Sequence, residues 1–119
     1  MANPNIVETS EILGKTHTQI ATTGNADFLS NGTNSGKIFK VNTVMVGNVN
    51  ATYAQSADLI YYNGSYNNYL AFRIFVPMGS SVALIGKDTP IYIEEGHKLQ
   101  IKASAANSLH FTVSYEIIS

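Results

Sequence analysis

Cysteine is absent from the chain, and charged residues are scarce. Without cysteine the protein can form no disulfide framework, no thiol nucleophile and no cysteine-based zinc site. Charged residues make up 13% of the sequence, which is about half of the usual quarter. The 7 basic and 8 acidic residues are scattered along the chain, so there is no basic stripe that could neutralise nucleic-acid phosphates. We therefore expect no nucleic-acid partner.

Long apolar runs and helical patterns are also missing. No apolar run approaches the roughly 20 residues that a membrane-spanning helix needs. Residues 1–14 lack the positive start and apolar stretch of a signal peptide. No stretch keeps the apolar spacing of an amphipathic helix over three turns. We expect no membrane partner, synthesis in the cytoplasm of the cell and a fold without substantial helices.

The sequence instead shows an apolar pattern with a period of two residues, which is typical of strands that bury one face. Residues 98–103 and 109–117 both alternate in this way, and the linker 105–108 predicts that they form a hairpin. The buried sets expected for these two strands are Leu99, Ile101 and Ala103, then Leu109, Phe111, Val113, Tyr115 and Ile117.

Further strands are predicted along the chain. Residues 15–23 and 26–30 form weak strands divided by Gly24-Asn25, and 57–63, 80–85 and 89–93 are rich in β-branched and aromatic residues. In the segment 36–49, one face is expected to carry Phe39, Val41, Thr43, Met45 and Val49. Val44 and Val46 make its second half apolar on both faces, so this strand is expected to be central. In the segment 69–76, the expected inward set is Leu70, Phe72, Ile74 and Val76.

These strands predict an all-β fold. A chain of 119 residues fits one domain. Eight or so short strands, with turn glycines about every ten residues, predict an antiparallel two-sheet β-sandwich that is jelly-roll-like. We expect this single domain to span 1–119. Residues 1–13 are expected to form either an extended N-terminal arm that binds another subunit or an ordinary frayed terminus.

Two carboxylates and an imidazole, those of Glu94, Glu95 and His97, flank Gly96 and could suggest a catalytic or metal site. If strands lie on both sides, Gly96 sits in the turn between them, and successive side chains point to opposite faces. Paired catalytic carboxylates need a defined separation, and a metal needs three or four converging ligands. We interpret the cluster as the polar tip of a hairpin.

Enzyme motifs are missing from the sequence. It contains no nucleophile elbow, phosphate-binding loop, dinucleotide-binding fingerprint or zinc-protease helix motif. His17 and His110 are expected at outward positions of their strands, where a polar neighbour on the next strand is a simpler partner than a substrate. We predict no enzyme activity, no catalytic residue, no metal and no cofactor.

Tyrosines and asparagines cluster in the segment 61–69, around the strong hairpin signal Asn63-Gly64. Tyrosine combines a rigid surface with a hydrogen-bonding tip, which suits protein interfaces and sugar-stacking platforms. Three interpretations stay open: a structural role in the core, a protein contact and a sugar site. The candidate contact residues are Tyr61, Tyr62, Tyr66, Asn67, Asn68 and Tyr69.

Three segments of the chain have a familiar sequence: residues 35–52 (SGKIFKVNTVMVGNVNAT), residues 57–62 (ADLIYY) and residues 84–118, which contain KDTPIYIEEGHKLQIKASA and end in VSYEII. They resemble small virion structural proteins of tailed bacteriophages. The resemblance is to phages of the marine and cyanophage type. It implies a non-enzymatic particle component, and its jelly-roll members resemble capsid decoration (cement) proteins, often trimeric. The implied partners are the chain itself, as a homotrimer, and the major capsid protein, with a location on the capsid surface of the virion. The resemblance gives no motif for individual contact residues.

Two other functions remain open at this stage. One is an adaptor associated with the tail, neck or fibre of the same kind of particle. The other is a carbohydrate-binding module that uses the tyrosines of 61–69, because jelly rolls also occur in lectins.

Overall fold

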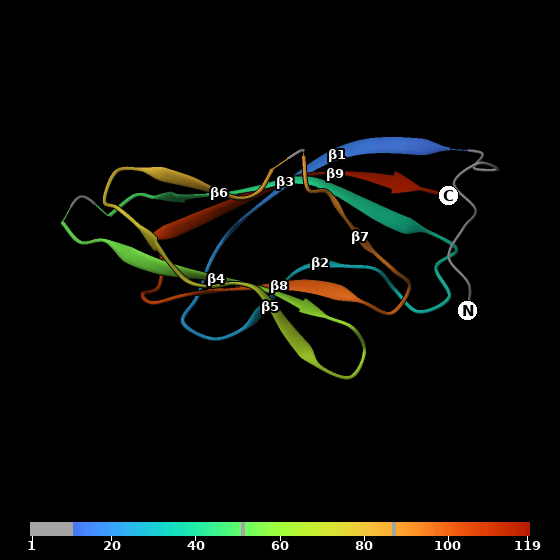
Figure 1. Cartoon of the computed structure of the whole chain (residues 1–119), viewed down its shortest axis with the longest axis horizontal. Helices are drawn as coiled ribbons and strands as arrows, with labels where there is room; N and C mark the ends of the chain where they lie inside the picture. The colour runs from blue at the N-terminus through green and yellow to red at the C-terminus, as the bar shows by residue number, and fades with distance from the viewer. Residues whose placement is uncertain (1–10, 51, 87) are drawn as a thin grey trace.

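The computed structural model describes residues 11–50, 52–86 and 88–119, which form two packed layers of antiparallel strands (Figure 1). No helix within these ranges is long and apolar enough to cross a membrane. The strands are β1 (Ile12–Ile20), β2 (Ala26–Ser30), β3 (Ile38–Asn48), β4 (Gln55–Tyr62), β5 (Asn67–Val76), β6 (Ser81–Ile85), β7 (Ile91–Ile93), β8 (Lys98–Ala103) and β9 (Leu109–Ile118).

The strands divide into two sheets. The first sheet has the order β1-β9-β3-β6, with β7 also paired to β3, and the second has the order β2-β8-β4-β5. Every pairing is antiparallel, and the two sheets face each other across the core (Figure 1). The predicted all-β, two-sheet sandwich is confirmed.

The pairings nest around the turn between β4 and β5. Outward from that turn, β4 pairs with β5, β3 with β6 and β7, β2 with β8, and β1 with β9. The chain is thus one long hairpin, and rolling it up adds the pairings β3 with β9 and β4 with β8. This is the jelly-roll arrangement that the strand spacing suggested.

Two predicted hairpins are wrong. β7 belongs to the first sheet and β8 to the second, and β9 returns to the first, so both connections cross between the sheets. The turn 94–97 is tight, with the N–H of His97 donating to the carbonyl of Glu94 at 3.0 Å and Gly96 at a φ of 80°. A period of two shows which face of a strand is buried but not which strand lies beside it, because strands of either sheet bury one face in the same core.

The core consists of the inward residues of both sheets. The alternation predicted for 98–103 and 109–117 is confirmed, with Ile117 only partly buried. Each large side chain removed from water contributes about 1.5–3 kcal/mol before the entropy of ordering is subtracted. The largest fully buried side chains are Phe111, Leu59, Ile60, Ile93, Leu99, Ile101, Leu109, Val41, Val44, Val46, Val76 and Val113.

Strand β3 does not keep one face over its whole length, and the predicted face is wrong beyond Val41. The pairing with β9 shifts between Val41 and Thr43, so the strand contains a bulge. A bulge inserts one unpaired residue and reverses the inward alternation that follows it. Consequently Val44 is buried, whereas Met45 is exposed.

Strand β1 forms the edge of the first sheet, and none of its side chains is fully buried. His17 was predicted to point outward, but it is paired opposite the inward-facing Val113 and contacts the ring of Phe28 at 5.4 Å. Of the predicted N-terminal arm, residues 1–10 lie outside the described residues. Ile12 and Leu13 belong to β1.

A buried asparagine joins the sheets at one end of the sandwich. The side-chain amide of Asn31, which follows β2, donates to the carbonyl of Ile93 at 2.9 Å and to that of Lys37 at 2.8 Å. Its oxygen accepts the hydroxyl of Ser35 at 2.6 Å. Only 2% of Asn31 is exposed. Its hydrogen bonds therefore supply donors, in place of water, to carbonyl groups where the chain crosses between the sheets.

A second buried asparagine does the same at the opposite end. The amide of Asn48, the last residue of β3, donates to the carbonyl of Val76 at 3.0 Å and to that of Tyr53 at 3.1 Å. Its oxygen accepts the N–H of Asn50 at 2.8 Å. Each end of the sandwich therefore has one asparagine that links the first sheet to the second.

We predict that Asn31→Ala lowers the free energy of unfolding by about 2–4 kcal/mol, because buried carbonyl groups lose their donors. Asn25→Ala, at an exposed position between β1 and β2, is the matched control and should change stability by less than about 0.5 kcal/mol. Urea denaturation followed by circular dichroism measures both. Equal stability of the two variants would show that the Asn31 bonds are dispensable.

Candidate protein interface on the β5 edge

The segment 61–69 forms a true hairpin between β4 and β5, as Asn63-Gly64 predicted. The side-chain oxygen of Asn63 accepts the N–H groups of Ser65 at 3.1 Å and Tyr66 at 2.8 Å. The N–H of Asn63 donates to the carbonyl of Tyr66 at 3.2 Å. Gly64 has a φ of 91°, a conformation that residues with a Cβ rarely adopt.

The hairpin brings the six predicted contact residues together but not in one role. Asn67 pairs with Tyr62 and Asn68 with Tyr61 in the strand register. Tyr66 is 72% exposed, and Asn67, Asn68 and Tyr69 are also exposed, whereas Tyr61 and Tyr62 are half-buried. The contact function of all six stays a prediction.

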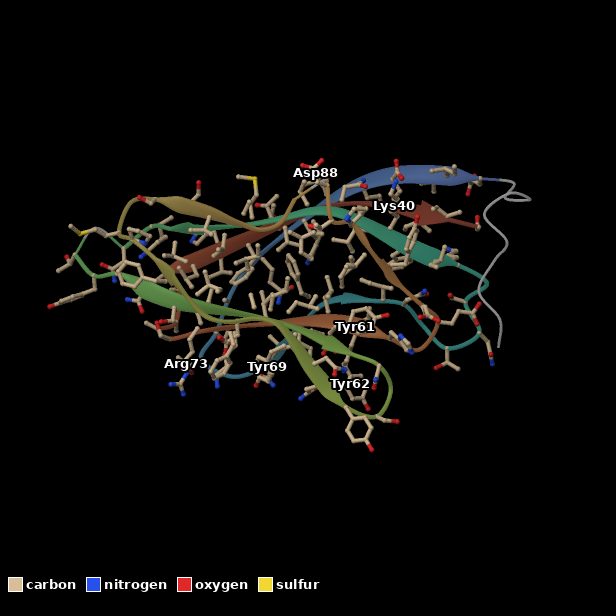
Figure 2. All side chains as sticks on the ribbon, viewed as in Figure 1. Lys40, Tyr61, Tyr62, Tyr69, Arg73 and Asp88 are labelled. Atoms are coloured by element: carbon tan, nitrogen blue, oxygen red, sulfur yellow. The ribbon has the colours of Figure 1, made fainter. Side chains whose placement is uncertain are left out.

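Tyr61 acts inside the protein. Its hydroxyl lies 3.1 Å from the carbonyl oxygen of Tyr92 and 2.7 Å from Nδ1 of His97, and it accepts the N–H of Glu94 at 3.4 Å. In Figure 2 its ring lies on the inner side of the second sheet, whereas Tyr62 and Tyr69 point away from the first sheet. Burial raises the pKa of the Tyr61 phenol above its ordinary value. Tyr61 thus links β4 to the crossing between β7 and β8.

Tyr62 takes part in a small polar network on the outer face of the second sheet. The ammonium of Lys98 lies 5.3 Å from the centre of the Tyr62 ring and 3.0 Å from Oδ1 of Asp27. Hydrogen bonds from Gln100 and Lys98 lower the pKa of the Asp27 carboxyl group. Because Asp27 and Lys98 are partly solvated, this ion pair fixes side-chain positions more than it stabilises the fold.

The cluster around Gly96 serves the turn. His97 bonds to Tyr61, and a carboxylate oxygen of Glu95 accepts the N–H of Gly36 at 3.0 Å. Within the described ranges, no group of three or more histidine, aspartate or glutamate side chains converges as metal ligands would. The interpretation of this segment as a polar turn fits these contacts, although the turn is not the tip of a hairpin.

Strand β5 exposes aromatic residues that the alternation pattern placed in the core. Leu70 and Phe72 were predicted to face inward, but they are 44% and 55% exposed. Two shifts in the register with β4 explain this error. On each side of the pair between Leu59 and Ala71, β5 contains one residue more than β4 does before the next pair. Each bulge reverses the alternation, so the inward residues are Ala71, Ile74 and Val76.

These bulges produce an exposed apolar surface at the edge of the second sheet, which we call the β5 surface. The rings of Tyr69 and Phe72 contact each other at 5.1 Å with planes at 89°. Phe75 is 65% exposed. Among the described strands, β5 pairs with β4 alone, so its other side is the edge of the sheet. The large exposed side chains of the β5 surface are Tyr66, Tyr69, Leu70, Phe72, Phe75 and Met78.

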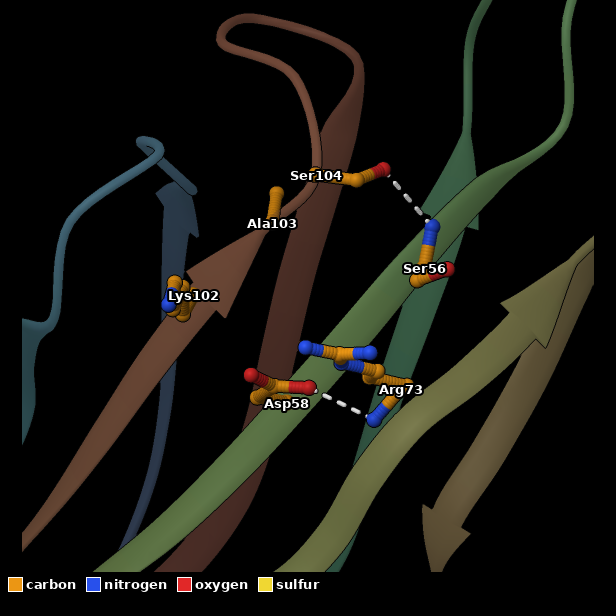
Figure 3. A pocket seen from close by; sticks show the side chains of 6 residues that line it. All are labelled: Ser56, Asp58, Arg73, Lys102, Ala103 and Ser104. Atoms are coloured by element: carbon orange, nitrogen blue, oxygen red, sulfur yellow. Dashed lines mark hydrogen bonds between the residues drawn. The ribbon is translucent and has the colours of Figure 1, made fainter.

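A pocket of about 360 Å³ opens beside this surface, on the outer face of the second sheet. Three neighbouring strands contribute Lys102 from β8, Asp58 from β4 and Arg73 from β5 (Figure 3). Ser56 and Ser104 close one end, and the N–H of Ser56 donates to the hydroxyl of Ser104 at 2.9 Å. No sequence motif marked this group, because the residues are far apart in the chain.

Arg73 has a φ of 51°, in the left-handed region that residues other than glycine rarely adopt. Its N–H donates to Oδ1 of Asp58 at 2.6 Å, and Asp58 is only 7% exposed. The carboxylate therefore holds the β5 bulge in place with a charge-assisted hydrogen bond.

We predict that Tyr61→Phe lowers the free energy of unfolding by about 1–2 kcal/mol at neutral pH, because the hydroxyl contacts with Tyr92 and His97 are lost. The raised pKa of Tyr61 means that the folded protein favours the neutral phenol. The contribution of Tyr61 to the free energy of unfolding is therefore complete below the pKa of tyrosine in the unfolded chain, about 10. It is lost as the pH rises through the pKa of Tyr61 in the folded protein.

Denaturation curves at pH 8 and above pH 10 measure this effect. The free energy of unfolding should fall less steeply with pH in Tyr61→Phe than in the wild type. Tyr66→Phe, at an exposed tyrosine, is the control and should keep the wild-type slope. Parallel slopes for the wild type and Tyr61→Phe would contradict the prediction.

No protein-family model matches the sequence, and no curated protein matches it. Among solved structures, a chain of the Bacillus endospore appendages, described as a novel family of disulfide-linked pili, matches with a TM-score of 0.55 and 13% identity. That match covers 99% of this chain and 96% of the other. A chain of the infectious bursal disease virus VP2 subviral particle matches with a TM-score of 0.33 and 11% identity, over 92% of this chain and 33% of that chain. The first likeness shows a shared fold, and the second is too low to support an inference.

Proposed function

We propose that this chain is a non-enzymatic structural protein of a bacteriophage particle, a decoration protein that binds the assembled capsid through the β5 surface. The exposure of large apolar side chains along β5 is the observation that carries this proposal. Soluble monomers rarely expose apolar patches of more than a few hundred Å², and larger patches mark interaction sites. The assignment to a phage rests on the resemblance of residues 35–118 to virion proteins.

The chemistry of the β5 surface favours a protein partner over a sugar. The rings of Tyr69 and Phe72 are perpendicular to each other, so they offer no common flat platform for stacking a sugar ring. Aromatic residues and arginine are the residue types most enriched at the centres of protein interfaces. The major capsid protein is the proposed partner, and the chain acts as a homotrimer.

A trimer would bind where several capsid subunits meet, so that three copies of one contact act together. Binding to the assembled shell and not to free capsid subunits then stabilises the shell by mass action. The association is noncovalent, because a chain without cysteine cannot form the disulfide links named for the endospore appendages.

Sedimentation with empty capsids of the phage that encodes this chain tests the proposal. The wild type should pellet with assembled capsids and stay in solution with unassembled capsid protein. Phe75→Ser should weaken capsid binding by at least about tenfold, as expected for an aromatic residue at the centre of an interface.

Met45→Ser is the matched control, because Met45 is an exposed apolar residue on the other sheet. It should bind capsids as the wild type does. Light scattering of the free protein checks the trimer. If the wild type does not sediment with capsids, or if Phe75→Ser and Met45→Ser bind equally well, the proposed function is wrong.

A further inference from the structure

The pocket beside the β5 surface contains two cations that form no ion pair with any residue that the structure describes. Among the described residues, neither the guanidinium of Arg73 nor the ammonium of Lys102 forms an ion pair. The hydroxyl of Ser56 also makes no hydrogen bond within these residues. Hydrogen-bond donors from three residues thus line one pocket of about 360 Å³ and have no acceptor in the described part of the chain.

Asp58 is the acidic group in this pocket, and its position gives it a structural task. Its Oδ1 accepts the N–H of Arg73 at 2.6 Å and so supports the left-handed bulge. With one carboxylate against two cations, the formal charge of the lining is +1. That charge favours a ligand with a single negative charge.

The position of Arg73 supports a binding role. Non-glycine residues in the left-handed region are strained and persist where the surrounding structure holds them, often at ligand sites. Here the bulge places Arg73 beside Phe72, with the guanidinium carbon 4.9 Å from the ring centre. Figure 2 shows Arg73 and Tyr69 on the outer face of the second sheet, and Lys40 and Asp88 on the opposite side of the molecule.

Apolar side chains border the pocket. Phe72 precedes Arg73, and Phe75 pairs directly opposite Ser56, so both lie next to residues of the lining. A partner that covers these rings would exclude water from the pocket, and an ionic contact there would be stronger than one in solvent. Arginine binds a carboxylate through two parallel hydrogen bonds, whereas lysine acts as a point charge.

We propose that the pocket binds the carboxylate of an aspartate or glutamate side chain that the partner protein presents to the β5 surface. This inference rests on the proposed function, since it assigns the pocket to a protein partner. Arg73 and Lys102 hold the carboxylate, Ser56 donates a further hydrogen bond, and Asp58 is a positioning residue. Phe72 and Phe75 contact the apolar neighbours of the acidic residue.

The test uses the isotopically labelled, full-length protein and small probes, with NMR chemical shifts as the measurement. The probe is N-acetylglutamate N-methylamide, and the glutamine compound of the same shape is its neutral match. The glutamate compound should shift the amide signals of Arg73, Lys102 and Ser104 and saturate, with a dissociation constant of the order of 10 mM. The glutamine compound should not saturate.

Arg73→Gly removes the guanidinium without straining the backbone, because glycine adopts a φ of 51° freely. It should weaken binding of the glutamate compound at least about fivefold and leave stability unchanged or higher. Lys102→Gln should also weaken binding. Lys40→Gln, on the other sheet, is the matched control and should bind as the wild type does.

Three results would overturn the inference. One is an equal response to the glutamate and glutamine compounds, and another is unchanged binding in Arg73→Gly and Lys102→Gln. The third is saturation by glucuronate at a tenfold lower concentration than by the glutamate compound, which would assign the pocket to acidic sugars. Capsid sedimentation is a separate measurement. A protein that binds the glutamate compound but not capsids would retain the carboxylate site while the proposed function fails.

Discussion

Backbone hydrogen bonding where the chain crosses between the sheets is the constraint on which the rest of the structure depends. A rolled hairpin leaves carbonyl groups at both ends of the sandwich that no neighbouring strand can reach, and a buried carbonyl without a donor is costly. Asn31 supplies donors at one end and Asn48 at the other. With these crossings satisfied, the apolar faces of the two sheets meet directly, with no helix among the described residues and no disulfide.

Strand β5 exposes apolar side chains because its inward and outward alternation is interrupted. Two bulges in β5 turn Leu70 and Phe72 away from the core, and the second bulge needs Arg73 in a left-handed conformation. The buried carboxylate of Asp58 holds that conformation. One polar contact in the sheet therefore supports both the exposed aromatic side chains and the cationic pocket beside them.

The sequence was sufficient to predict the fold class and most of the strands. A strand that buries one face shows an apolar pattern with a period of two residues, and this pattern can be recognised without knowing which strands pair. It predicted the Asn63-Gly64 hairpin because that signal is local. It misassigned the connections on either side of β8, because the sequence of a strand does not determine which other strand pairs with it. It also misplaced Met45, Leu70 and Phe72. A bulge formed by a residue other than glycine, such as Arg73, leaves no recognisable signal in the sequence. The pocket could not be predicted, because topology alone brings Asp58, Arg73 and Lys102 together.

The nested pairing also orders the entropy costs of folding. The β4–β5 hairpin closes a loop of a few residues, whereas pairing Ile12 with Ile118 encloses almost the entire chain. The cost of closing a loop grows with its length, and a fold dominated by such distant contacts forms slowly. Each inner pair shortens the effective loop of the next one outward, so the sandwich can close from β4 and β5 toward its ends. Strand β1 pairs last in this order. Because none of its side chains is fully buried, its pairing adds the least apolar burial to the fold.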